Sequence, residues 1–332
     1  MTILRLLLVC LISTCVLQAQ DAPKEGKKER IEKRLRLADQ LESQGDEEGA
    51  LQILEDLSGK NPDDQDLLRR IATLQLKNGR AKEAIPVLKR LLELGGGKDV
   101  EYVALARLMI EVDEQEEAIA LLEEGAKRYP EAAEFPFLLT FPLSRLERWK
   151  EAISQFEKTL ALAKEADEGA TDSAFHFRYA SALERSGDLE KAVPLFRKTL
   201  DLIDTEATAE EAPDFKATVL NYLAYLWIER NENLEEAGKM ALEAAKLSPD
   251  SGAIADTVGW YHFQKENYPR ALAELKKAER LIPEPDPVIL DHIGQTLAKL
   301  NEAEFASEYF QKALELDPDN TEIKKRLEAL KH

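Results

Sequence analysis

One alanine recurs along the chain in a similar sequence context, and its spacing constrains the fold more than any other feature. The intervals between successive copies are 34, 34, 34, 40, 45, 34 and 35 residues. A period in this range is typical of proteins built from stacked repeats, in which each repeat is one small unit that packs against its neighbours. The eight copies are Ala50, Ala84, Ala118, Ala152, Ala192, Ala237, Ala271 and Ala306.

Two further series keep the same phase as this alanine. The first is a small residue 12 or 13 positions earlier, namely Ala38, Ala72, Ala106, Thr140, Ala180, Ala224, Gly259 and Gly294. The second is an apolar residue four positions later, namely Leu54, Leu88, Leu122, Phe156, Phe196, Ala241, Leu275 and Phe310. Two antiparallel helices approach closely where both carry small side chains, with large apolar side chains beside the crossing. Each repeat is therefore predicted to be a helical hairpin, with the first helix ending at glycines such as Gly45, Gly79 and Gly187.

The prolines that follow the hairpins complete a known pattern. The spacings Gly259…Ala271…Ala278…Pro283 and Gly294…Ala306…Ala313…Pro318 resemble the tetratricopeptide repeat (TPR) position for position. The resemblance implies an all-α, right-handed superhelical solenoid of about eight hairpins. The predicted repeats are 31–64, 65–98, 99–132, 133–166, 173–206, 217–251, 252–285 and 287–320, followed by a capping helix at 321–332.

The two longest intervals indicate insertions near 166–171 and 204–213. Both segments are acidic and lack apolar periodicity. They are predicted to be helix extensions joined by exposed loops.

The N-terminus has the features of an export signal. Residues 1–19 carry Arg5, then an apolar run from Leu6 to Leu17, and cleavage is predicted after Ala19. Residues 20–30 form a charged linker. The run is too short to span a bilayer as a helix, so no membrane span is expected, and the chain is predicted to be a periplasmic or secreted bacterial protein. The alternative is a lipid anchor on Cys15, because Ile12-Ser13-Thr14-Cys15 partly resembles a lipobox.

Charge and motif content argue against several classes of function. The net charge of −19 disfavours nucleic acid as a partner, because phosphate backbones would be repelled. The four histidines have no metal-ligand spacing, His262 is predicted to pack in the core, and the segment 95–98 lacks the phosphate-loop pattern. Neither an enzyme activity nor a cofactor or metal is predicted.

The resemblance also implies where a partner would bind. In this family the first helices line a concave groove, and the groove positions include Val103, Ser181 and Asp256. We predict that an extended or helical peptide is held there by aromatic anchors, with arginines pairing with its carboxylates. The predicted peptide-binding residues are Arg107, Phe137, Phe141, Arg145, Phe177, Arg185, Asn221, Tyr225, Trp260 and Phe263.

Two alternatives to this groove remain open. Aromatic residues on a helix face are often part of the core, so some of these side chains would then be buried. The second alternative is that the protein is a structural subunit of an envelope assembly or a homo-oligomer that uses its convex or terminal faces. In both the groove hypothesis and this second one, the partner is a protein.

Overall fold

The computed structural model describes residues 26–330, except for 96, 167–170 and 207–211. The predicted signal and Cys15 lie outside the described residues. The described part of the chain contains helices and no strand. The helices are α2 (Lys27–Ser43), α3 (Glu47–Ser58), α4 (Gln65–Lys77), α5 (Ala81–Glu93), α6 (Asp99–Glu111), α7 (Gln115–Arg128), α8 (Glu134–Arg145), α9 (Trp149–Ala166), α10 (Ser173–Arg185), α11 (Leu189–Glu206), α12 (Ala212–Glu229), α13 (Leu234–Leu247), α14 (Gly252–Gln264), α15 (Tyr268–Leu281), α16 (Pro287–Lys299), α17 (Ala303–Leu316) and α18 (Thr321–Ala329).

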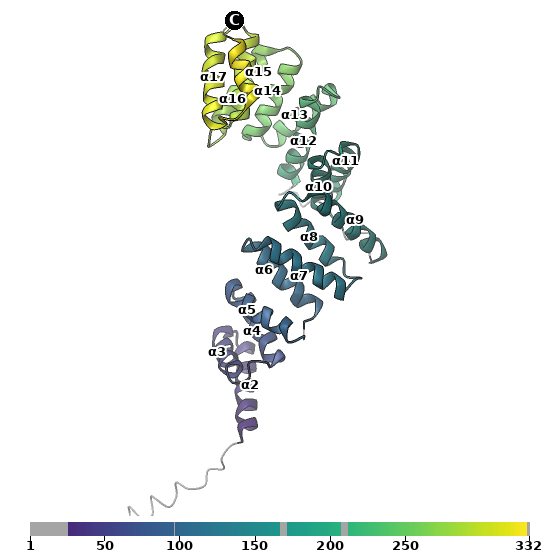
Figure 1. Ribbon diagram of the computed structural model, residues 1–332, viewed down its shortest axis with the longest axis vertical. Coiled ribbons are helices and arrows are strands. Elements are labelled where there is room, and N and C mark those ends of the chain that lie inside the picture. Colours follow the sequence, from purple (N-terminus) through teal and green to yellow (C-terminus); the bar gives the residue numbers. More distant parts are fainter. Residues whose placement is uncertain (1–25, 96, 167–170, 207–211, 331–332) are drawn as a thin grey trace, which may run out of the picture. The chain divides into compact units, whose positions relative to one another are not determined.

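The helices pair in chain order within two compact units. The first unit extends to Leu146, and the second begins at Glu147. In the first unit α2 packs on α3, α4 on α5 and α6 on α7, with α8 on α7. In the second unit α10 packs on α11, α12 on α13, α14 on α15 and α16 on α17 (Figure 1). The prediction of an all-α chain of helical hairpins is confirmed, and the sense of the superhelix stays a prediction.

The three in-phase series form the centre of the hairpins. All eight recurring alanines are 0% exposed, and every member of the other two series is buried as well. A Cβ atom built on Gly259 would lie 2.6 Å from Cγ of Leu275, and one built on Gly294 would lie 2.6 Å from Cε1 of Phe310. The small residues are therefore required for the close approach of the two helices, as the sequence predicted.

The turns inside seven of the hairpins share one backbone geometry. In seven hairpins the residue five positions before the recurring alanine has a positive φ, and in four of these seven it is not glycine. Gly79 has φ 69°, whereas Glu266 has φ 56° at the matching position. A left-handed residue thus closes the turn whichever side chain the sequence supplies. The seven residues are Gly45, Gly79, Asp113, Glu147, Gly187, Glu266 and Asn301.

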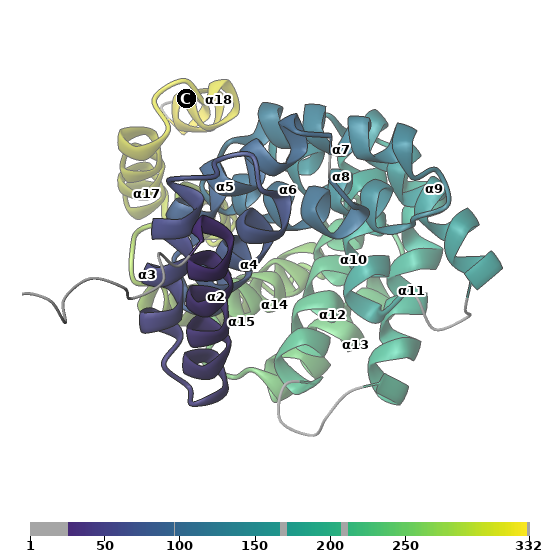
Figure 2. The ribbon, with the colours of Figure 1, turned by 90° about the horizontal axis from the view of Figure 1, so that it is seen from below.

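The irregular spacing is explained by longer helices. α9, α11 and α12 have 18 residues each, which confirms the predicted helix extensions, while most of the predicted loops lie outside the described residues. After the last hairpin, α18 packs against α17, as Figure 2 shows. Its Ile323 is buried in the apolar cluster of the final hairpins, and Leu327 and Leu330 pack against the same cluster.

Candidate functional site

The predicted peptide-binding residues of the first unit lie on α6 and α8. Arg107 is exposed on α6. Phe137 and Phe141 are half-buried on α8, with their rings edge to face at a centroid distance of 5.3 Å. Arg145 is exposed, but its Nε donates to Oδ1 of Asp113 at 2.9 Å. That Arg145 pairs with a peptide carboxylate stays a prediction, and in the structure its partner is an acidic residue of the same unit.

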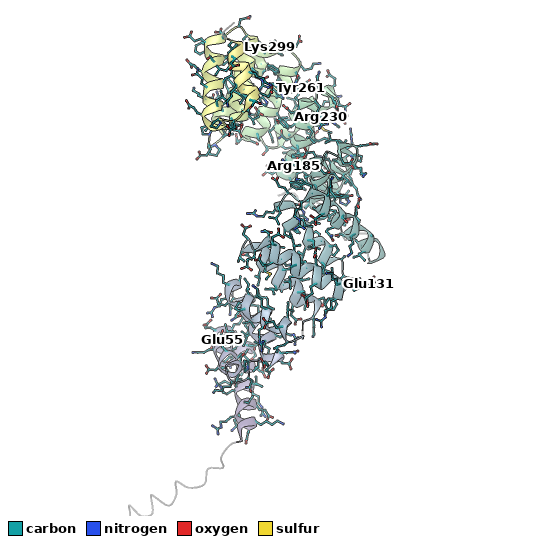
Figure 3. The ribbon with its side chains drawn as sticks, in the orientation of Figure 1. Glu55, Glu131, Arg185, Arg230, Tyr261 and Lys299 are labelled. Atoms are coloured by element: carbon teal, nitrogen blue, oxygen red, sulfur yellow. The ribbon has the colours of Figure 1, made fainter. Side chains whose placement is uncertain are left out.

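In the second unit, Phe177 and Arg185 are also engaged within the protein. The half-buried ring of Phe177 packs edge to face against Phe196, Phe215 and Tyr222. Arg185, labelled in Figure 3, lies in the last turn of α10, with its Nε 3.6 Å from Oε2 of Glu184. The ring contacts of Phe177 join α10 to α11 and α12, whereas the contact of Arg185 lies within α10.

The structure corrects the prediction for Trp260. This residue is only 6% exposed, so it is not a solvent-facing anchor. Its ring is stacked between Phe263, at a centroid distance of 4.2 Å, and His292, at 4.0 Å. The physical reason is that α16 packs beside α14 and covers the indole with its histidine. The other five predicted aromatic residues are half-buried, so the alternative that some of the predicted anchors belong to the core holds for Trp260.

The remaining predicted residues, Asn221 and Tyr225, line a pocket in the second unit. The pocket has a volume of about 270 Å³ and is formed by the first helices of three successive hairpins, α12, α14 and α16. Its lining includes no lysine or arginine. The lining residues are Asn221, Tyr222, Tyr225, Ala253, Asp256, Thr257, Asp286, Val288 and Ile289.

Asp256, one of the lining residues, forms a buried ionic pair with His292 that was not predicted from the sequence. Nδ1 of His292 lies 2.9 Å from Oδ1 of Asp256, and Nε2 lies 3.8 Å from Oε1 of Glu229. Burial alone would favour the neutral ring, but the carboxylates of Asp256, Glu229 and Asp291 outweigh it and raise the pKa of His292. Because both ring nitrogens face carboxylates and the proton is held more tightly, this histidine is poorly suited to act as a general base.

The two tyrosines of the pocket also face acidic groups. Burial, followed by a hydrogen bond to Glu184, raises the pKa of Tyr222 to about 12. Burial also raises the pKa of Tyr225, and the charges of Glu229, Asp256 and Asp286 raise it further. The hydroxyl groups therefore stay protonated at neutral pH, and the surroundings of the Tyr225 hydroxyl are negative.

The residues described here also bear on metals and membranes. We find no group of three or more histidine, cysteine, aspartate or glutamate side chains placed to hold a metal ion in the described ranges. Within the same ranges, no helix is both long and apolar enough to cross a membrane. His262 is buried, as predicted, and this burial lowers its pKa.

Comparison with known proteins places these hairpins in a family. A tetratricopeptide repeat model matches residues 25–215, and a second tetratricopeptide repeat model matches residues 289–320. The TPR repeat-containing protein PA4667 of Pseudomonas aeruginosa is 27% identical over 221 residues, which are 66% of this chain and 29% of that protein. The TPR repeat-containing protein YpiA of Bacillus subtilis is 25% identical over 175 residues, which are 53% of this chain and 40% of that protein.

A solved structure shares the fold. It is the C-terminal part of a TPR repeat-containing protein from Cytophaga hutchinsonii, which is 13% identical, with a TM-score of 0.51 over 69% of this chain and 84% of that chain. This chain spans less than half the length of the curated relatives it matches. Proteins built from these repeats are generally non-catalytic scaffolds that bind proteins or peptides. The family model covers more than half of the sequence, and the chain belongs to the tetratricopeptide repeat family.

Proposed function

We propose that this protein is a non-catalytic scaffold of the bacterial cell envelope that binds a peptide segment of a partner protein at the pocket of α12, α14 and α16. The observation that carries the proposal is the pocket itself, which the first helices of three successive hairpins line together. Its walls combine tyrosine rings with amide and carboxylate oxygens, a composition suited to a side chain that enters from a peptide. Arg107 and the half-buried pair of Phe137 and Phe141 are proposed as a separate contact surface of the first unit.

Blocking the pocket tests this proposal. Ala253 lines the pocket and is exposed in the first turn of α14, so Ala253→Trp fills the pocket without entering the core. Ala303 is exposed in the first turn of α17 and serves as the matched control, Ala303→Trp. Heptapeptides selected from a random display library on the full chain should bind Ala253→Trp at least about tenfold more weakly, a loss of ~1.4 kcal/mol. Equal loss in Ala303→Trp, or no loss in either variant, contradicts the proposal.

The envelope location rests on the N-terminal sequence. The export signal 1–19 supports a periplasmic or secreted protein, and Cys15 offers the alternative of a lipid anchor. Fractionation of cells that express the full chain should place it outside the cytoplasm. A wild type found in the membrane fraction that Cys15→Ala moves to the soluble fraction would show that the lipid anchor is used. Retention of the whole chain in the cytoplasm would contradict the location.

A further inference from the structure

We propose that the pocket of α12, α14 and α16 takes the cationic side chain of a lysine or arginine from the bound peptide. This inference rests on the proposed peptide-binding function and reverses the charge expected from sequence, where arginines of the protein were to pair with peptide carboxylates.

The groups at the pocket carry more negative than positive charge. Three carboxylates, those of Asp256, Asp286 and Glu229, influence the hydroxyl of Tyr225. When protonated, the ring of His292 balances one of these charges, because its two nitrogens lie 2.9 Å from Asp256 and 3.8 Å from Glu229. Asp291, which also lies near His292, has its own partner, because Nη1 of Arg326 donates to its Oδ2 at 2.8 Å. Near Tyr222, the charges of Glu184 and Arg185 offset each other, since Nε of Arg185 lies 3.6 Å from Oε2 of Glu184. Asp286 in the lining and Glu229 beside Tyr225 therefore leave two negative charges, and the lining itself includes no basic residue.

Asp286 presents its charge at an accessible place. It is the N-cap of α16, and its Oδ1 accepts from the backbone N–H groups of Val288, at 2.7 Å, and Ile289, at 3.3 Å. The residue is exposed, and the neighbouring Val288 is 46% exposed. An incoming side chain would meet a carboxylate whose position is fixed by the helix it caps.

The inner wall supplies an acceptor and two aromatic rings. Oδ1 of Asn221 is buried and has no hydrogen-bond partner in the part of the chain that the structure describes. A buried acceptor without a partner is costly, so a donor group that enters the pocket gains from satisfying it. The rings of Tyr222 and Tyr225 line the same pocket, and aromatic faces attract ammonium and guanidinium groups. Lysine and arginine side chains carry both the donors and the charge that this wall fits.

The test removes charge while it keeps shape. Asn caps helices about as well as Asp, so Asp286→Asn keeps the cap of α16, and Glu229→Gln keeps a hydrogen-bond acceptor for Tyr225. The matched control is Asp64→Asn, since Asp64 caps α4 in the first unit with the same pattern, accepting from Asp66 at 3.1 Å and Leu67 at 3.2 Å. The probes are heptapeptides selected on the full chain, each made again with every lysine or arginine replaced by norleucine.

We expect the selected peptides to share a basic residue. Replacing this residue by norleucine should weaken binding about tenfold or more, and the double variant Asp286→Asn with Glu229→Gln should do the same. Asp64→Asn should bind as the wild type does. If the double variant loses its helical signal, Asp286→Asn alone gives the answer, because this residue is exposed. If Ala253→Trp blocks binding of the peptides but the charge variants bind them normally, the cation inference is overturned and the peptide-binding function stands. Peptides that Ala253→Trp does not block would overturn both.

Discussion

At the scale of single residues, the turn position five before seven of the recurring alanines is left-handed whether or not it is glycine. Gly79 and Glu266 have the same left-handed geometry, but a left-handed conformation costs a residue with a Cβ roughly 1–2 kcal/mol. Glu266→Gly should therefore raise the free energy of unfolding by about 1 kcal/mol, and Gly79→Ala should lower it by a similar amount. Urea unfolding followed by circular dichroism measures both, and effects of equal sign would contradict the argument.

The buried pair of His292 and Asp256 makes a second prediction at this scale. The raised pKa of His292 means that its charged form stabilises the fold. This contribution is complete below the ordinary pKa of 6.5 and is lost as the pH rises through the raised value. His292→Gln should remove this pH dependence and lower stability by roughly 3–5 kcal/mol, because Asp256 would lose its partner. Thermal melts from pH 5 to 9 measure both effects, and a wild type that gains stability over the alkaline half of this range would contradict the assignment.

At the scale of helices, the hairpin core depends on small residues, because a larger side chain at these positions would clash with the facing helix. In Gly294→Ala the new Cβ would meet Phe310, so we expect a loss of about 1–3 kcal/mol. Gly59→Ala is the control, since its Cβ would lie 3.5 Å from the nearest atom, an ordinary contact, and its φ of −56° suits alanine. A loss in Gly59→Ala as large as in Gly294→Ala would show that close approach is not the cause.

The final helix makes a separate prediction. Ile323 of α18 is buried against the last hairpins, so Ile323→Ala should lower stability by about 2–5 kcal/mol. Leu316→Ala is the control, because this leucine is 47% exposed. Hydrogen exchange should rise in α16 and α17 for Ile323→Ala alone. Unchanged exchange in both helices would mean that α18 does not cap the array.

At the scale of the whole chain, the hairpins were predictable from sequence, and so were Asn221 and Tyr225 as binding residues, but the buried contacts behind the pocket were not. The small and apolar series recur once in each repeat. Because these residues lie where the two helices of a hairpin pack together, their burial follows from the hairpin itself. The pocket depends on contacts between successive repeats, such as Asp256 with His292, which lie 36 residues apart and in no local motif. The sequence feature that could have indicated these contacts is a polar residue at nearly the same place in three successive repeats, namely Asn221, Asp256 and His292.

The same distinction explains the error at Trp260. The family pattern assigns this position to the groove, but a neighbouring helix decides whether a groove side chain is covered. Here the ring of His292 lies 4.0 Å from the indole and covers it. The burial of an aromatic residue between repeats depends on the side chains of the next repeat, which a single-repeat pattern does not include.

The most direct test of the central claim is hydrogen–deuterium exchange of the full chain with and without a selected basic heptapeptide. We predict slower exchange in the middle of α12, the first turns of α14 and the start of α16, where the lining residues of the pocket lie. The first unit should exchange as before in its α2 to α5 hairpins. Protection confined to the first unit or to α17 and α18, with none at the pocket, would contradict the account.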